Sequence, residues 1–349
     1  MTIEISRMLE KLTDRQDLNL DEAELLMAEI MAGKISERKM AAFLVALKMK
    51  GESKDEVAAF ARVMRENAIR IRPNINGLVD SCGTGGDGLG TFNISTTAAI
   101  IAAGAWVKIA KHGNRSVSSK CGSADVLEQL GVKMLQPEDV KKCIEKIGIG
   151  FMFAPYFHPA MKNVAPVRKE LGMKTVFNIL GPLTNPAGAD AQVIGVYDRK
   201  IMRIVADALT ELDVKRALVV HSDGMDEIGL GKTNVTEIRD GTIEEYVLDG
   251  KEFGFSKRIL QKINSNEESA RIIRNILGGV EGAEMDVAIL NAAAVIYVAG
   301  AADSIERGIE LAMQSIDSGN AMRKLDKMIE FGKTIHNRDE ERGGKNGHP

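Results

Sequence analysis

The first part of the chain has the spacing of apolar side chains that is typical of short amphipathic helices. Apolar residues recur every three or four positions from Asp21 to Met31 and again after Ser36, a residue type that caps helix N-termini. Residues 53–56 read Ser-Lys-Asp-Glu, which is the form of a capping box and predicts a third helix there. We therefore expect a small helical domain over residues 1–74.

From residue 77 the pattern changes to short apolar runs that alternate with helical segments. The runs are typical of strands and lie near residues 78–80, 105–110, 148–154, 191–197 and 216–221. Two closer runs, 234–239 and 242–248, are joined by Asp240-Gly241 and predict an antiparallel hairpin. The order predicts an α/β protein: a small helical N-terminal domain, then a larger domain (75–335) whose mostly parallel central sheet is flanked by helices.

Three further segments bear on membrane association, targeting and order. The longest apolar stretch, 287–302, is interrupted by Asn291 and is shorter than the roughly 18–20 residues that a membrane span needs. It therefore predicts a buried helix and no membrane partner. The N-terminus is acidic and amphipathic, unlike a signal peptide. Residues 336–349 are polar and contain glycine, so they predict a disordered tail.

Length, hydrophobic content, net charge and cysteine spacing limit the classes of protein to which this chain can belong. A length of 349 residues, 44% of them hydrophobic, suits two domains with a substantial core. A net charge of −3 gives no overall attraction to nucleic acid, so we expect no nucleic-acid partner. The cysteines are Cys82, Cys121 and Cys143; their spacing is not that of metal ligands and is typical of a reduced, cytoplasmic protein.

The most informative segment is 81–96, SCGTGGDGLGTFNIST, which follows the first predicted strand. Five glycines within eight positions let the backbone turn sharply and expose its N–H groups. Polar side chains follow them at the start of a helix predicted from about Asn93, and a helix N-terminus favours anions. The segment therefore predicts a phosphate or pyrophosphate site.

Other glycine-rich loops fit this segment less well. Residues 83–88 match the dinucleotide pattern G-x-G-x-x-G, but a further loop separates them from the helix. The next strand is followed by Lys111, where a dinucleotide site has an acidic residue, and the Gly-Lys-Ser/Thr of a Walker A loop is absent. A purely structural turn explains the glycines but not the polar residues behind them.

A second polar loop, 111–123 (KHGNRSVSSKCGS), follows the next strand. It contains three cations and four serines but no acidic residue, so its chemistry suits an anion better than a merely solvated basic loop would. Ser123 is placed to cap the helix predicted from about Ala124. Both loops follow the carboxyl ends of strands, where open α/β sheets bind their ligands.

These two segments, with 158–186 (HPAMKNVAPVRKELGMKTVFNILGPLTNP) and 221–228 (HSDGMDEI), resemble the anthranilate phosphoribosyltransferases of tryptophan biosynthesis. The resemblance extends from about Ile5 to the helices before Lys333. It implies transfer of the phosphoribosyl group of phosphoribosyl pyrophosphate to the amine of anthranilate, which gives N-(5-phosphoribosyl)anthranilate and pyrophosphate. It also implies that helices within about 165–188 complete the helical domain and that this domain forms a homodimer.

The resemblance assigns residues of both loops to the donor, phosphoribosyl pyrophosphate. In the first segment these are Gly83, Gly86, Asp87, Thr91, Asn93, Ile94, Ser95 and Thr96. In the second loop they are Lys111, His112, Gly113, Asn114, Arg115, Ser116, Val117, Ser118, Ser119 and Ser123. A carboxylate repels pyrophosphate, so a ligand role and a turn-forming role both stay open for Asp87.

Adjacent carboxylates usually form a solvated acidic turn, yet one or two carboxylates plus substrate phosphates commonly bind Mg²⁺. The resemblance implies that Ser95, Asp226 and Glu227 hold this cofactor. It assigns the acceptor, anthranilate, to Gly83, Asn114, His158 and Arg168. A guanidinium fork suits the anthranilate carboxylate. We assign no general base, because an aromatic amine is uncharged at neutral pH and positioning then supplies most of the catalysis.

Two other functions stay open at this stage. A pyrimidine nucleoside phosphorylase shares the two-domain architecture and the glycine loop but has a different second loop. A non-catalytic relative that binds nucleic acid would have a basic surface, against the acidic balance of this chain. We expect no fused glutamine-amidotransferase domain, whereas association with a separate anthranilate synthase stays open.

Overall fold

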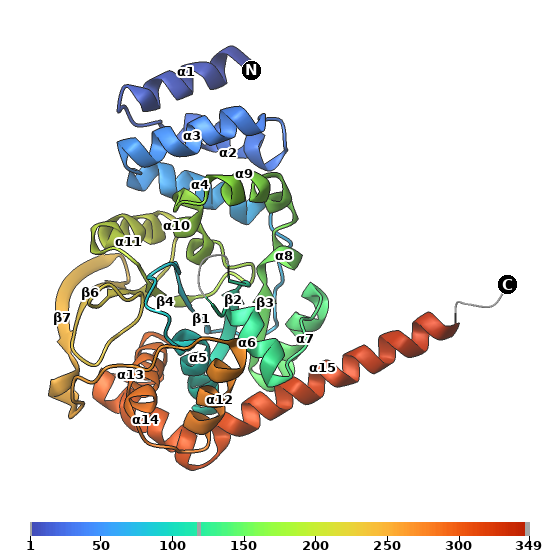
Figure 1. Cartoon of the computed structure of the whole chain (residues 1–349), viewed down its shortest axis with the longest axis vertical. Coiled ribbons are helices and arrows are strands. Elements are labelled where there is room, and N and C mark those ends of the chain that lie inside the picture. The colour runs from blue at the N-terminus through green and yellow to red at the C-terminus, as the bar shows by residue number, and fades with distance from the viewer. Residues whose placement is uncertain (1, 117–119, 346–349) are drawn as a thin grey trace.

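The computed structural model describes residues 2–116 and 120–345. The chain opens with the helices α1 (Thr2–Thr13), α2 (Leu20–Met31), α3 (Glu37–Lys50) and α4 (Lys54–Glu66), which form a bundle at one end of the molecule (Figure 1). The predicted caps are confirmed: Ser36 Oγ accepts from Lys39 N, and Ser53 and Glu56 form a capping box.

Two helices from much later in the chain pack on this bundle. They are α9 (Ala165–Leu171), which contacts α3, and α10 (Val176–Leu183), which contacts α3 and α4 (Figure 1). Val167 and Phe177 are buried in the same apolar cluster as Phe43 and Phe60, whose rings meet edge to face. This core continues onto one face of the central sheet.

The larger part of the molecule is built on a seven-stranded sheet of order β3-β2-β1-β4-β5-β6-β7. The strands are β1 (Leu78–Gly83), β2 (Lys108–Gly113), β3 (Ile149–Phe153), β4 (Ala191–Gly195), β5 (Arg216–His221), β6 (Lys232–Arg239) and β7 (Thr242–Asp249). The first five pair in parallel, and β6 and β7 form the predicted antiparallel hairpin. Asp240 and Gly241 both have positive φ, as a tight hairpin turn requires. The predicted mostly parallel sheet is confirmed.

The remaining helices cover the sheet and link its strands. They are α5 (Ile94–Gly104), α6 (Ser123–Leu130), α7 (Pro137–Ile147), α8 (Ala154–Phe157), α11 (Met202–Glu211), α12 (Asn266–Leu277), α13 (Ala283–Val298), α14 (Ile305–Asp317) and α15 (Asn320–Lys345), with short 3₁₀ turns at Pro159–Asn163, Arg199–Ile201 and Gly250–Phe253. α13 is almost entirely buried, as predicted, and packs on α5 and α14. Among the described residues, no helix combines the length and apolar character that a membrane crossing requires.

Two expectations about element boundaries are wrong. α15 runs on to Lys345, so residues 336–345 are helical and not a disordered tail, because no proline or glycine interrupts the charged sequence from residue 336 until Gly343 (Figure 1). β2 begins at Lys108 and not at residue 105, since Ala105 ends α5 and Trp106 turns the chain with a φ of 70°.

Candidate active site

The carboxyl ends of β1, β4 and β5 meet at one edge of the sheet, where Gly83 pairs with Gly195 and Gly195 with Val220. The turn that follows β5 carries Asp226 and lies directly against these strand ends. A Cβ on Gly195 would lie 1.5 Å from the Asp226 carbonyl oxygen, and one on Gly83 would lie 2.4 Å from Asp226 Oδ2. Glycine is needed at both positions because the acidic turn occupies the space of a side chain.

The glycine-rich loop folds over the same edge. Gly85, Gly86, Gly88 and Gly90 all have positive φ, which is the region that glycine adopts most readily. Gly85 N donates to Asp226 Oδ2 at 2.7 Å and so fixes the loop to the acidic turn. Asp87 Oδ1 accepts from Leu89 N at 3.1 Å, which is the turn-forming use that the sequence left open for Asp87.

Of the acidic pair, Asp226 is withdrawn from water and Glu227 is half-buried beside it. Asp226 is 8% exposed, and Glu227 Oε1 accepts from Ser95 N at 3.1 Å. Burial, and then the negative charge of Asp87, raise the pKa of Asp226; burial, and then Asp226, raise the pKa of Glu227. Like charges this close together, and partly shielded from water, favour a bound cation.

The start of α5 faces this cluster. Lys111 Nζ lies 3.4 Å from Ser95 Oγ and also donates to Ser81 O. Thr96 is 1% exposed, and its Oγ1 has no hydrogen-bond partner among the described residues. Within the same residues the Thr96 N–H has no acceptor either. Unpaired buried donors at a helix N-terminus fit an anionic ligand.

The second loop forms ion pairs and hydrogen bonds with α6 that were not predicted from the sequence. Lys111 belongs to β2 and is buried, whereas the Arg115 guanidinium pairs with Asp125 at 3.0 Å and with Glu128 at 2.6 Å. Ser123 does not cap α6, contrary to expectation: Gly122 is the N-cap, and the Asp125 carboxylate accepts from Gly122 N at 2.9 Å and from Ser116 N.

The Ser123 hydroxyl has another use, which explains the wrong prediction. Ser123 Oγ accepts from Asn114 N and donates to Asn114 O, both at 3.2 Å, and so closes the loop. Three residues that the resemblance assigns to the donor, Val117, Ser118 and Ser119, lie outside the described residues.

Two of the histidines in the quoted motifs, His112 and His158, lie together. The rings of His112 and His158 have centroids 5.0 Å apart, and the Nε2 atoms of both are buried without a partner in the described residues. Burial lowers the pKa of His112 to about 3 and that of His158 to about 4, so both are neutral at pH 7. Gly181 O accepts from His112 Nδ1 at 3.2 Å, which leaves the lone pair on Nε2.

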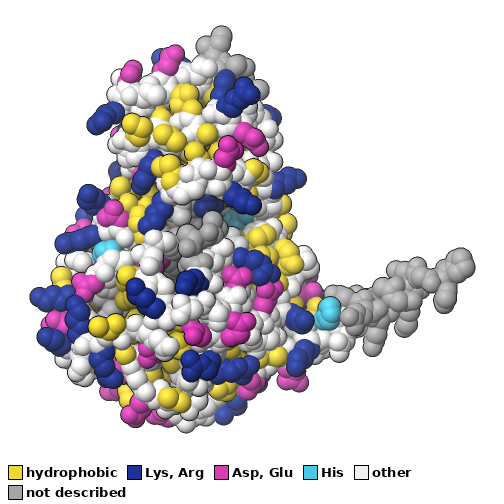
Figure 2. Space-filling model, in the orientation of Figure 1, with side chains coloured by type: hydrophobic (Ala, Val, Ile, Leu, Met, Phe, Trp, Pro, Cys, Tyr) yellow, Lys and Arg dark blue, Asp and Glu magenta, His cyan; other side chains and the backbone are white. Residues whose placement is uncertain are grey.

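Arg168 lies on α9, in the part of the molecule that packs with the helical bundle. Its guanidinium carbon is 5.6 Å from the centroid of the Phe177 ring, and burial lowers its pKa. Among the described residues the Arg168 side chain has no ion pair, and no hydrogen bond joins it to the two histidines. Figure 2 shows Lys and Arg side chains on both sides of the junction between the bundle and the larger domain.

Several residues at this edge were missed in the sequence analysis. Asp80, fully buried in β1, accepts from His112 N at 3.0 Å and from Asn185 Nδ2 at 2.7 Å, and so links two of the quoted motifs. Lys174 Nζ lies 3.7 Å from the Tyr197 ring centroid, and its Cε would be 2.9 Å from a Cβ on Gly86. Both Asn185 and Lys174 stand in the quoted motif 158–186 and could have been singled out there.

The chain matches two domains of one family in the expected order. The helical bundle domain of the glycosyl transferase family matches residues 6–68, and the a/b domain of that family matches residues 76–322. The anthranilate phosphoribosyltransferase of Methanocorpusculum labreanum is 52% identical over 330 residues, 93% of this chain and 97% of that protein. That of Haloarcula marismortui is 53% identical over 326 residues, 92% of this chain and 98% of that protein.

Solved structures agree. The crystal structure of anthranilate phosphoribosyltransferase from Thermus thermophilus is 45% identical and superposes with a TM-score of 0.88 over 93% of this chain and 99% of that one. The Saccharomyces cerevisiae enzyme in complex with PRPP and Mg is 27% identical, with a TM-score of 0.87 over 95% of this chain and 98% of that one. The chain therefore belongs to the glycosyl transferase family defined by these two domains and, within it, to the anthranilate phosphoribosyltransferases.

Proposed function

We propose that this protein transfers the phosphoribosyl group of phosphoribosyl pyrophosphate to the amine of anthranilate, the second step of tryptophan synthesis from chorismate. The names of the relatives support this function, and so do yeast structures with PRPP and Mg and with 4-fluoroanthranilate. They give no support to a nucleoside phosphorylase or to a nucleic-acid-binding relative. The observation that carries the proposal is that Asp226 and Glu227 lie at one sheet edge with the Thr96 donors, which have no partner among the described residues.

The same edge of the sheet would bind the donor, phosphoribosyl pyrophosphate. The Thr96 amide and hydroxyl, at the positive end of α5, would bind the pyrophosphate oxygens. The buried Lys111 ammonium beside Ser95 adds a positive charge that is held within the protein and not in bulk water. The glycine-rich loop brings further backbone N–H groups close to the ligand because its glycines carry no side chains.

A magnesium ion fits the same edge. Asp226, Glu227 and the Ser95 hydroxyl would hold it, with the substrate phosphates and water completing its oxygen ligands. The described residues contain no closed group of three metal-binding side chains, which suits an ion that shares its ligands with a substrate. When bound, Mg²⁺ supplies charge stabilisation to the departing pyrophosphate.

The acceptor would lie between neutral and cationic side chains. The Arg168 guanidinium, without an ion pair in the described residues, would bind the anthranilate carboxylate. His112 Nε2 has a lone pair and no partner among those residues, so it can accept a hydrogen bond from the anthranilate amine. A neutral aromatic amine needs orientation more than deprotonation before it attacks the ribose carbon.

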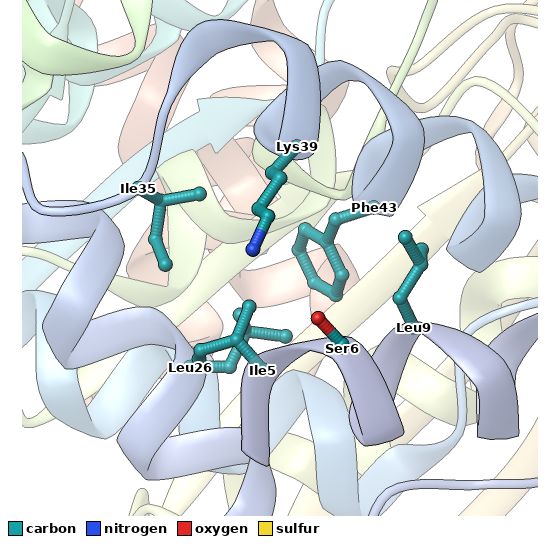
Figure 3. Close-up of a pocket in the computed structure, with 7 residues that line it drawn as sticks. All are labelled: Ile5, Ser6, Leu9, Leu26, Ile35, Lys39 and Phe43. Carbon is teal, nitrogen blue, oxygen red and sulfur yellow. The ribbon is translucent and has the colours of Figure 1, made fainter. Parts of the chain in front are cut away.

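We also propose a cytoplasmic homodimer that associates through the helical domain, residues 1–74 completed by 165–188. On this domain α1, α2, α3 and Ile35, which lies between α2 and α3, line a small apolar hollow that also contains Ser6 and Lys39 (Figure 3). The reduced state of the cysteines fits the cytoplasm, since Cys82, Cys121 and Cys143, all among the described residues, form no disulfide. Light scattering of the full chain tests the dimer, and a monomeric mass at micromolar concentration would contradict it.

The reaction is tested by following anthranilate fluorescence with phosphoribosyl pyrophosphate and Mg²⁺. We expect a decay that requires both the donor and the metal, with pyrophosphate released in equal amount. A flat trace from protein with an intact circular dichroism spectrum would refute the proposed function.

A further inference from the structure

Ser269 lies on α12, far in sequence from the glycine-rich loop, and is completely buried. Its hydroxyl makes two hydrogen bonds with Asn93, the N-cap residue of α5, and also interacts with the Cys121 side chain of the second loop. Ser269 Oγ donates to Asn93 Oδ1 at 2.8 Å and accepts from Asn93 N at 3.2 Å. The hydroxyl therefore uses its donor hydrogen and one acceptor position on a single residue of the donor site.

The second loop holds the other side of the Asn93 amide. Asn93 Nδ2 donates to Cys121 O at 3.2 Å, and Cys121 Sγ lies 3.1 Å from Asn93 Oδ1. The side chain thus points away from its own helix, towards α12 and the second loop. The Asn93 side chain makes no capping hydrogen bond.

This is not how asparagine ordinarily acts at an N-cap. Its side-chain oxygen usually accepts from the backbone N–H two or three positions into the helix. Asn19 does so at the start of α2, where Asn19 Oδ1 accepts from Glu22 N at 2.9 Å. In α5 the corresponding amides are those of Ser95, which donates to Glu227, and Thr96, which is unpaired within the described residues.

We propose that Ser269 is a positioning residue for the donor: it holds the Asn93 side chain off the start of α5, so that the Thr96 amide stays available to a phosphate. Ser269 acts through its hydrogen bonds with Asn93. The inference rests on the proposed function, because it takes this end of α5 as the pyrophosphate site. Without Ser269, only Cys121 still holds the Asn93 side chain, so Asn93 Oδ1 can turn back more readily and accept from Thr96 N, in competition with the ligand.

The test is Ser269→Ala in the full-length protein. We expect the KM for phosphoribosyl pyrophosphate to rise about fivefold. An asparagine cap of ordinary strength would compete with the phosphate for the Thr96 amide by about that factor. The Kd of inorganic pyrophosphate, measured by calorimetry with Mg²⁺, should rise by the same factor. The kcat and the KM for anthranilate should stay unchanged, because neither the acceptor nor the reacting atoms depend on this amide.

A matched control is Ser315→Ala. Ser315 is also a buried serine whose hydroxyl donates to α5, to Ile101 O at 2.7 Å, but at the other end of the helix. We expect this variant to lower Tm and to leave the KM for the donor unchanged. An equal rise of that KM in Ser315→Ala would attribute the effect to loss of packing and overturn the proposal.

A double-mutant cycle with Asn93→Ala identifies the route of the effect. If Ser269 acts through Asn93, adding Ser269→Ala to Asn93→Ala changes neither the KM nor the pyrophosphate Kd. A full effect in that background, or a folded Ser269→Ala protein with wild-type donor binding, would contradict the proposal. A wild-type protein that binds pyrophosphate without transferring phosphoribose would refute the proposed function alone, and calorimetry would still decide on Ser269.

Discussion

Gly195→Ala is the substitution that tests most directly how the acidic turn is placed. The added Cβ would lie 1.5 Å from the carbonyl oxygen of Asp226 and 2.3 Å from its carbonyl carbon. These are backbone atoms, so no side-chain rotation relieves the contact. Either the turn moves away from β4 or the end of β4 bends.

The 1.5 Å separation between the added Cβ and the Asp226 carbonyl oxygen sets the expected loss of stability and activity. Normal contact requires the turn to move by about 2 Å, and such overpacking typically costs about 1–3 kcal/mol of stability. Asp226 moves with its backbone, and its bond from Gly85 N, now 2.7 Å, is lost. A displacement of this size in a group that positions the reaction lowers kcat/KM on the order of a hundredfold.

The assay is the rate of anthranilate consumption as a function of Mg²⁺ concentration. We expect the half-saturating Mg²⁺ concentration to rise by at least about tenfold along with the loss of rate, since the displaced carboxylate is a proposed metal ligand. Gly150→Ala is the matched control: in β3, its Cβ would lie 2.6 Å from Ile144 Cγ1, an atom of a side chain. That variant should lose stability without a changed Mg²⁺ requirement.

One result would refute this reasoning. If Gly195→Ala folds with a near-native Tm and keeps both the wild-type rate and the wild-type Mg²⁺ requirement, then the placement of Asp226 against the strand ends does not matter for the reaction. Equal shifts in Mg²⁺ requirement for Gly195→Ala and Gly150→Ala would refute it as well, because strain in the sheet alone would then suffice.

Three other predictions follow from the site. Asp226→Asn combined with Glu227→Gln should abolish both the rate and its Mg²⁺ dependence, and unchanged activity would rule out the metal assignment. Arg168→Ala should raise the KM for anthranilate about tenfold or more, the value of a charged hydrogen bond, while leaving donor binding intact; equal loss of both would contradict the assigned role. The neutral histidines should make stability depend on pH. The folded-state pKa of His158, about 4, lies below the unfolded value of about 6.5, so the unfolded state binds the proton first and stability falls as pH drops between these values. We expect this histidine to lower the free energy of unfolding by about 2 kcal/mol at pH 5 relative to pH 7.5. The prediction would be disproved if the melting temperature of a His158→Gln variant depended on pH in the same way as that of the wild type.

Features that depend on residues close together in the chain could be predicted from the sequence. The caps at Ser36 and Ser53 were predicted correctly because each is a contact between residues three positions apart. Ser123 has the same residue type in the same setting, yet its hydroxyl bonds Asn114 on the preceding loop, and Asp125 takes over the cap. The helical extension to Lys345 was missed because polar composition alone does not separate a solvated helix from a disordered tail.

The sequence by itself determined the order of elements, the parallel sheet and the presence of two polar loops at strand ends. These features depend on the periodicity of apolar residues and on glycine, serine and threonine close together in the chain, and such patterns are visible in the sequence itself. Tertiary structure alone decided that Gly195 must lack a side chain and that Ser269 turns Asn93 away from its own helix. Both depend on atoms that the fold brings together from distant parts of the chain, and no local pattern of residues records such a contact.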